Sequence, residues 1–204
     1  MKMMNIELLT HTPDPELVIA DAARTCYCSP KKDLEASRKM IRAIVKSGHE
    51  SCVEHASATF RMSNVSRALT HEAVRHRLFS FSQKSQRYVK EDEPSYVVPE
   101  TIIGNPHLEG EFYKAMRAAW DSYALLLKAG VKPEDARFVL PNACTTEIVV
   151  SGNFREFRNF LKLRLSPRAQ WEIRKAANII LDKLYEIAPS CFEDLKDGSS
   201  IQTT

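Results

Sequence analysis

Between Cys52 and Met62 the sequence changes from a helical period to a period of two residues. Apolar side chains take one face of this segment and polar side chains take the other. The apolar face consists of Ala56, Ala58 and Phe60, and the polar face consists of His55, Ser57, Thr59 and Arg61. Such alternation is typical of a strand with one buried face. The segment therefore predicts a strand, with an unusually polar second face, in a chain that is otherwise mostly helical in period.

Two more strands are expected, at residues 5–10 and 147–152. Helices are expected where capping residues, Gly or Pro bound a 3.6-residue period. They run from Asp14-Pro15 to Arg24, from Asp33 to Gly48, from Ser63 or Asn64 towards Leu78, from 109 to 129, from 133 to 141, from Asn153 onward, and from Ser166-Pro167 to about 187. These elements predict a helix-rich α/β or α+β fold in one domain.

Charge and cysteine content limit the classes of function. The 204 residues carry 29 Lys and Arg against 26 Asp and Glu, a net charge of only +3, which is low for a protein that grips duplex DNA. The five cysteines are odd in number and form no paired CxxC motif. Without a signal-peptide pattern or a membrane-spanning apolar run, the sequence predicts a cytoplasmic protein with reduced thiols.

The stretch "RHRLFSFSQKSQRY", residues 75–88, concentrates arginines and hydroxyls. The dipole at a helix C-terminus accounts for one cation there, but not for Arg75, Arg77 and Arg87 together. Guanidinium groups offer a flat fork of donors that matches phosphate or carboxylate oxygens, and serines add further donors. The stretch indicates either a pocket for a phosphorylated compound or a surface cluster of ion pairs.

The segment "NFREFRNFLKLR", residues 153–164, places Arg155 and Asn159 on one face of a helix, opposite an apolar stripe. Asn is a poor helix former, so amides on a polar face are unusual there. Arg158 and Lys162 form a second polar row, which we expect to be solvated. In "GHESCVEH", residues 48–55, the histidine spacing differs from the HExxH motif, and no metal site is expected.

The Arg75–Tyr88 stretch resembles the signature of the flavin-dependent thymidylate synthases, which is Arg-His-Arg, seven residues, then Ser. Arg75, His76, Arg77 and Ser85 fill these positions. Within this stretch, "SQKSQRY" resembles the rest of the signature loop. Three other segments resemble blocks of the family, in the same order and at similar spacing across residues 20–190: "GHESCVEHASATF", "ARFVLPNA" and "GNFREFRNFLKLR…AQWEIR". The resemblance implies one domain over residues 1–204, helix-rich, α/β (α+β), around a central and mostly antiparallel sheet.

The resemblance also implies the activity. Members convert dUMP to dTMP, with 5,10-methylenetetrahydrofolate as one-carbon donor and a hydride from NADPH that passes through tightly bound FAD. A homotetramer with shared flavin sites is implied, without nucleic acid or membrane as a partner. His49, Glu54 and His55 are candidates to lie near the flavin, where folate and NADPH must reach.

Site residues follow from motif positions. The implied FAD contacts are Ser51, Arg75, His76, Arg77, Gln83, Asn153, Arg155 and Asn159. The implied dUMP contacts are Glu72, Arg75, Gln83, Lys84, Ser85, Gln86, Arg87, Arg137 and Arg164. The catalytic assignments are Arg164, which matches the arginine that activates the pyrimidine, and Ser85, as a hydrogen-bond donor. The chain departs from some members at Glu72, where they carry Gln, at Gln83, where they carry Glu, and at Arg168, where they carry His.

Two other classes of function fit the sequence less well. A nucleic-acid-binding module would use Arg75–Tyr88 as a basic, aromatic patch, but it leaves Asn153, Arg155 and Asn159 without a role. A flavin-free thymidylate synthase needs an activated cysteine, and no cysteine here lies in a Pro-Cys-His-type setting. Ser85 has no evident base beside it in the sequence. The sequence therefore predicts a reaction without an enzyme nucleophile.

Overall fold

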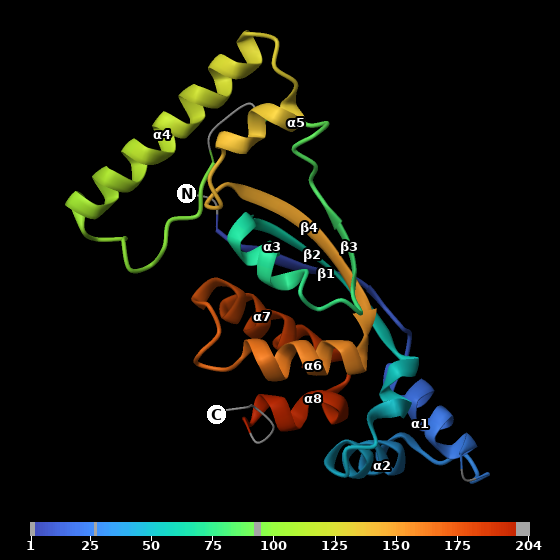
Figure 1. The fold of residues 1–204 in the computed structure, drawn as a ribbon. Coiled ribbons are helices and arrows are strands. Elements are labelled where there is room, and N and C mark those ends of the chain that lie inside the picture. Colours follow the sequence, from blue (N-terminus) through green and yellow to red (C-terminus); the bar gives the residue numbers. More distant parts are fainter. Residues whose placement is uncertain (1–2, 27, 92–94, 199–204) are drawn as a thin grey trace. The chain divides into compact units, whose positions relative to one another are not determined.

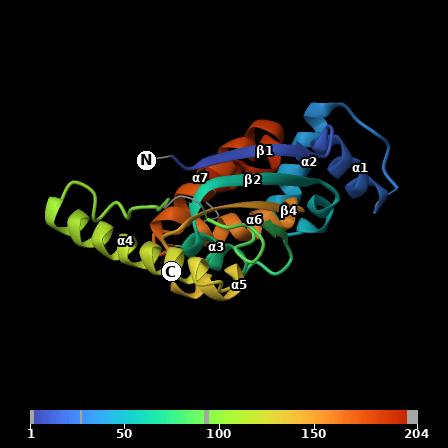
Figure 2. The same cartoon turned by 90° about the horizontal axis from the view of Figure 1, so that it is seen from above.

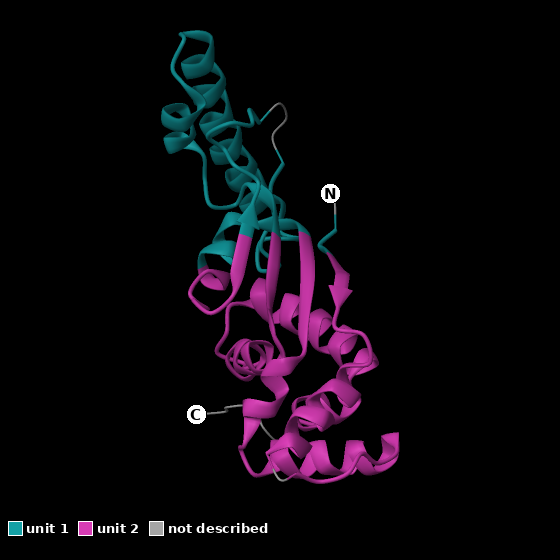
Figure 3. Cartoon of the chain, turned by 90° about the vertical axis from the view of Figure 1, so that its right-hand side faces the viewer, with its two compact units in different colours: residues 1–5, 63–71, 82–148 teal, residues 6–62, 72–81, 149–204 magenta. Residues whose placement is uncertain are grey.

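The computed structural model describes residues 3–26, 28–91 and 95–198. The described residues fall into two compact units, which Figure 3 shows in different colours. Unit 1 is drawn from residues 1–5, 63–71 and 82–148, and unit 2 from residues 6–62, 72–81 and 149–204. Each unit is described by itself below. The single domain expected over residues 1–204 stays a prediction.

A four-stranded sheet has the order β1-β2-β4-β3 (Figure 2). Its strands are β1 (Asn5–His11), β2 (Ser57–Ser66), β3 (Ser80–Gln83) and β4 (Thr145–Asn153), and the unit boundary falls within each of them. In β2, Ala58, Phe60 and Met62 are at most 2% exposed, which confirms the predicted alternation. Helices come between these strands and after the last of them in the sequence. The predicted mixed fold, helix-rich around an antiparallel sheet, is confirmed.

Unit 2 holds most of the helices. They are α1 (Pro15–Thr25), α2 (Leu34–Lys46), the 3₁₀ helix η1 (Glu50–His55), α6 (Phe154–Arg164), α7 (Trp171–Ile187) and α8 (Pro189–Lys196). Figure 1 shows α6, α7 and α8 side by side. Phe154, Phe157 and Leu161 of α6 are at most 1% exposed, as the apolar stripe predicted. Edge-to-face packing of Phe157 on Phe60 of β2 fixes α6 against the sheet.

In unit 1 the chain forms α4 (Pro106–Lys128), α5 (Pro133–Ala136) and the 3₁₀ helix η2 (Arg137–Val139). The apolar stripe of α4 is half-buried except at Tyr123, which is buried, and its other members are Phe112, Met116, Trp120 and Leu127. The Tyr123 hydroxyl accepts a hydrogen bond from the Glu91 main-chain N–H at 3.3 Å. Helix α3 (Arg67–Ala73) begins in unit 1 and ends in unit 2.

Two helix starts were predicted correctly with their caps. Asp33 accepts a hydrogen bond from the Ala36 N–H at 2.8 Å, and α2 ends before Gly48, whose φ of +77° suits glycine. At the start of α6, Asn153 accepts from the Glu156 N–H at 3.0 Å, and the Glu156 carboxylate accepts from the Asn153 N–H at 2.9 Å. This reciprocal capping box fixes the first turn of α6.

The predicted start of β2 and of the helix after it were wrong. Residues 52–55 belong to η1, and strand pairing begins only at Ser57, whose carbonyl accepts from the Thr12 N–H at 3.0 Å. The strand then continues through Ser63 and Asn64, the two predicted caps. The Ser66 hydroxyl takes the capping role instead, because it accepts from the Leu69 N–H at 3.0 Å. Pairing with neighbouring strands outweighs the local capping signal here.

The C-terminal helices also differ from the prediction. Residues 166–170 form turns, and α7 begins at Trp171, because the Gln170 side chain caps it by accepting from the Glu172 and Ile173 N–H groups. A further helix, α8, was not predicted and follows the break at Ala188. Within the described residues, none of the helices is long and apolar enough to cross a membrane. The cytoplasmic location stays a prediction.

Candidate functional site: two pockets and an arginine cluster

Arg164, the last residue of α6, contacts the end of α3 within unit 2. Its Nε donates to His76 Nε2 at 3.0 Å, and its Nη2 donates to the Glu72 carbonyl oxygen at 3.1 Å. Its Nη1 donates to the Glu72 carboxylate. The structure thus brings together three residues that the sequence predicted separately, and it holds the guanidinium of Arg164 in a fixed orientation.

His76 is neutral in this arrangement. Its Nε2 accepts the bond from Arg164, so the ring proton of the neutral form lies on Nδ1. Burial, and after it the charge of Arg164, lowers the pKa of His76 to about 4. The ring packs edge-on against Phe160 at 4.9 Å between centroids. A neutral imidazole leaves the positive charge of the cluster on Arg164.

Phe79 connects the Arg75–Arg77 turn to the core of unit 2. It is 7% exposed, and its ring lies 4.7 Å from that of Phe157. The ring also lies against Gly152 of β4, where an added Cβ would come within 2.3 Å of Phe79 Cδ1 and 2.6 Å of Glu156 Oε2. Only glycine leaves room for both neighbours. The close approach therefore sets the position of the Arg75–Arg77 turn and of the capping carboxylate together.

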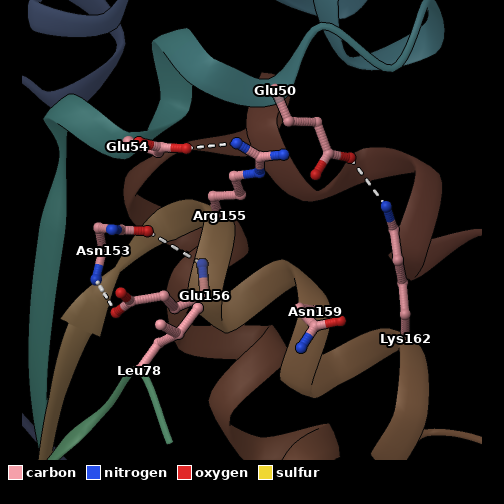
Figure 4. A pocket seen from close by; sticks show the side chains of 8 residues that line it. All are labelled: Glu50, Glu54, Leu78, Asn153, Arg155, Glu156, Asn159 and Lys162. Carbon is pink, nitrogen blue, oxygen red and sulfur yellow. Dashed lines mark hydrogen bonds and ion pairs between the residues drawn. The ribbon is translucent and has the colours of Figure 1, made fainter. Parts of the chain in front are cut away.

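A pocket of about 500 Å³ opens in unit 2 between η1 and the first turns of α6 (Figure 4). Its lining residues are Glu50, Glu54, Leu78, Asn153, Arg155, Glu156, Asn159 and Lys162. The volume lies within the usual range for small-molecule sites. Arg155 and Asn159 both line it, as their i, i+4 spacing predicted. Arg155 pairs with Glu54, and both side chains are about half exposed.

A second pocket, of about 200 Å³, shares three lining residues with the first: Leu78, Glu156 and Asn159. Its lining residues are Arg75, His76, Arg77, Leu78, Phe79, Glu156, Asn159, Leu163 and Arg164. Six of the eight predicted flavin residues line one pocket or the other: Arg75, His76, Arg77, Asn153, Arg155 and Asn159. Ser51 is exposed on η1, between pocket residues Glu50 and Glu54, and Gln83 lies in unit 1.

The predicted solvated row on α6 was wrong. Arg158 is 1% exposed, forms a bidentate pair with Asp194 of α8 at 2.7 Å, and reaches Glu50 at 3.1 Å. Lys162 donates to the same Glu50 carboxylate at 2.8 Å. Burial raises the pKa of Glu50, but the bond from Lys162 and the charge of Arg158 outweigh it and hold that pKa below its usual range. These ion pairs fasten η1 to α6, and two of their members, Glu50 and Lys162, line the pocket.

The remaining predicted nucleotide residues lie in unit 1. Gln83 donates to the hydroxyl of Thr70 at 3.0 Å and to that of Thr146 at 3.4 Å. Lys84 pairs with Glu91 at 2.7 Å, and its carbonyl accepts from Arg67 Nη2 at 3.0 Å. The Ser85 hydroxyl accepts from the Arg87 N–H at 3.2 Å. These bonds shape the loop after β3.

Arg87 and Arg137 share one acidic neighbour in unit 1. Arg87 Nε and Nη2 each lie 3.2 Å from Glu134 Oε2. Arg137 Nε donates to the Glu134 carbonyl oxygen at 3.1 Å. Arg87 also lies over the ring of Tyr88, at 5.3 Å from its centroid. Both predicted phosphate arginines are therefore held by α5.

Sequence reasoning missed Arg67. Its Nε and the Gln86 side-chain nitrogen are buried and have no hydrogen-bond partner among the described residues. Burial lowers the pKa of Arg67, and the charge of Arg137 lowers it further, against a raising effect from Glu91. Buried donors without acceptors, beside a cluster of cations, fit an anionic ligand. The sequence signal was weak, because Arg67 stands alone at a helix start.

The chain matches the family described as "Thymidylate synthase complementing protein" over residues 7–190. It is 45% identical over 204 residues to the flavin-dependent thymidylate synthase of Geobacter sulfurreducens, covering 96% of this chain and 88% of that protein. It is 42% identical over 214 residues to the enzyme of the same name from Clostridium tetani, covering 93% of this chain and 86% of that protein.

A solved structure has the same fold. It is a crystal structure of a UMP/dUMP methylase, PolB from Streptomyces cacaoi, bound with 5-Br dUMP. The TM-score is 0.85 at 24% identity, covering 97% of this chain and 96% of that one. The family match and the relatives show that this chain belongs to the family of the flavin-dependent thymidylate synthases.

Proposed function

We propose that this chain converts dUMP to dTMP, with 5,10-methylenetetrahydrofolate as one-carbon donor and with NADPH as reductant through FAD. The observation that carries the proposal is the pair of adjoining pockets in unit 2, which six of the eight expected flavin residues line. Membership of the family supplies the reaction class.

The pocket residues fit FAD. Arg75, Arg77 and Arg155 offer guanidinium forks for a pyrophosphate, and the exposed Leu78 offers apolar surface for a ring system. Arg155 can exchange Glu54 for a phosphate at little cost, because exposed ion pairs are weak. Bound FAD supplies the hydride that completes the methyl group.

Different residues bind the phosphate and the base of the nucleotide. Arg87 and Arg137, joined by the missed Arg67, supply the positive charge for the 5′-phosphate, and buried Gln86 contributes an amide that still needs an acceptor. Ser85 is a hydrogen-bond donor to the nucleotide. Its hydroxyl can donate while it accepts from the Arg87 N–H.

Arg164 polarises the uracil ring. C5 of the ring becomes a carbon nucleophile only if the negative charge that develops on the carbonyls and N3 is stabilised. Glu72 and neutral His76 hold the guanidinium of Arg164 in place before the substrate binds, so that little reorganisation is needed during the reaction.

The reaction needs no nucleophile from the protein. Burial, and after it the charge of Glu91, raises the pKa of Cys144 to about 11. Burial, and after it the charge of Glu16, raises the pKa of Cys191 to about 12. Neither thiol forms a thiolate near neutral pH, which supports electrostatic activation of uracil in place of covalent attack at C6.

The flavin sites are shared within a homotetramer. Six of the expected flavin residues line the pockets of one chain, whereas Gln83 lines neither pocket and would be supplied by a neighbouring copy. The half-buried apolar stripe of α4 offers surface that a neighbouring subunit can cover.

The test is an assay of dTMP formation by the purified chain with dUMP, methylenetetrahydrofolate, NADPH and FAD. Arg87→Ala should raise KM for dUMP roughly 10–100-fold with a smaller change in kcat, because it removes a charged bond to phosphate. Arg164→Ala should lower kcat roughly 100-fold at saturating dUMP. A colourless protein that forms no dTMP overturns the proposal, and the reverse pattern in the two variants exchanges their roles.

A further inference from the structure

Glu134 is the one acidic residue that contacts two of the proposed phosphate arginines in the described part of unit 1. Its carboxylate pairs with Arg87, and its main-chain oxygen accepts from Arg137. It stands in the first turn of α5, directly after Pro133. Glu134 lies just before the segment "ARFVLPNA" and outside the segments that resemble blocks of the family.

The two contacts use the same edge of each guanidinium. Arg87 is held through Nε and Nη2, and Arg137 is held through Nε. A phosphate can be bound by the Nη groups of an arginine fork, in parallel N–H···O bonds. The contacts with Glu134 leave Nη1 of Arg87 and both Nη groups of Arg137 for such bonds.

Holding an arginine in place has value because its side chain is flexible. Ordering a long side chain on binding costs conformational entropy, which weakens the complex. Arg87 is further held by its N–H on Ser85 and by the ring of Tyr88 beneath it. The carboxylate also offsets the repulsion between two cations before a ligand arrives.

We propose that Glu134 is a positioning residue for the phosphate of dUMP, setting the orientation of Arg87 and Arg137 from one point on α5. This inference rests on the proposed function. It assigns Glu134 an effect on binding and not on stability, because the side chains of Arg87 and Glu134 are 52% and 38% exposed and such pairs add little to folding.

The experiment compares three variants with the holoenzyme: Glu134→Ala, Glu134→Gln and Asp135→Ala. Asp135 is the matched control, since it is an exposed carboxylate next in the same helix. The measurements are dUMP affinity, deoxyuridine affinity, KM and kcat, and the melting temperature. Glu134→Ala should weaken dUMP binding about tenfold with kcat nearly unchanged. Glu134→Gln should recover part of the loss, because its amide oxygen still accepts from Arg87.

Deoxyuridine separates the phosphate from the base. Its binding should be the same in all variants, as should the melting temperature, and Asp135→Ala should match the wild type. Equal dUMP affinity in Glu134→Ala and Asp135→Ala overturns the inference, and so does tighter binding in Glu134→Ala, which would make Glu134 a competitor of phosphate. Failure of the wild-type chain to bind dUMP would instead overturn the proposed function.

Discussion

The protonation of His76 links the candidate site to the stability of unit 2 at acidic pH. Its pKa in the folded chain is about 4, lowered by burial and then by Arg164, against about 6.5 for a free histidine. Between about pH 4 and about pH 6.5, His76 therefore binds a proton in the unfolded chain but not in the folded chain. The stabilising contribution is complete above about pH 6.5 and is lost as the pH falls towards about 4.

We expect His76→Gln to flatten this part of the stability profile. The Gln amide oxygen can still accept from Arg164 but does not titrate. Urea unfolding between pH 6.5 and 4 should show a wild-type slope steeper by at most ~1.4 kcal/mol per pH unit. Parallel profiles for wild type and His76→Gln would show that His76 does not titrate in this range.

At the residue scale, the sequence predicted which face of a helix a side chain lies on better than it predicted what that side chain contacts. The i, i+4 spacing placed Arg155 and Asn159 on one face, and both line the larger pocket. The same spacing said nothing of what faces Arg158, because Glu50 and Asp194 come from distant segments. Arg67 was missed for the same reason. Its buried Nε is evident only once the fold surrounds it.

At the scale of elements, the ion pairs of Arg158 fasten η1 and α8 to α6. Removing one member of a buried pair leaves a charge without compensation, and this costs several kcal/mol. The side chains of Glu50 and Asp194 are 12% and 21% exposed, so water can only partly replace Arg158.

Arg158→Met should lower the free energy of unfolding by about 3 kcal/mol. Lys162→Met is the matched control on the same helix and should cost about 1 kcal/mol or less, because Lys162 is 28% exposed and Glu50 keeps Arg158. Urea unfolding at neutral pH measures both values. Equal losses in the two variants would mean that burial of Arg158 contributes nothing beyond an ordinary surface pair.

Element boundaries were predictable where a local cap decides them and not where pairing does. Asp33 and Asn153 cap their helices through their own side chains, and both starts were predicted. The start of α3 is set by how far β2 stays paired, which Ser63 and Asn64 do not reveal. The residues of η1 do not alternate themselves, and the predicted strand reached back to Cys52 only because the alternation that begins at Ala56 was extended into them.

At the scale of the whole molecule, the helix-rich α/β or α+β class followed from three expected strands among helical periods, and the antiparallel sheet was implied by the family resemblance, whereas subunit assembly lies beyond a single chain. Shared flavin sites make a sharp prediction. An Arg77 variant and a Gln83 variant, each unable to hold flavin, should regain part of the flavin absorbance when mixed, because Gln83 lines neither pocket and would come from a neighbouring copy, so that some hybrid sites contain neither substitution. Flavin content after mixing and exchange of subunits is the measurement. Sites built within one chain would recover no absorbance.

The contact between Gly152 and Phe79 also restricts how these two distant positions of the sequence can change independently in evolution. A Cβ at residue 152 would come within 2.3 Å of the Phe79 ring, so glycine cannot be replaced while that ring stays in place. We expect a larger residue at 152 to be acceptable only after a smaller one has arisen at 79 and the Glu156 carboxylate, 2.6 Å from the same Cβ, has taken another position. An alanine at 152 beside the present Phe79 and Glu156 should therefore be the least stable intermediate.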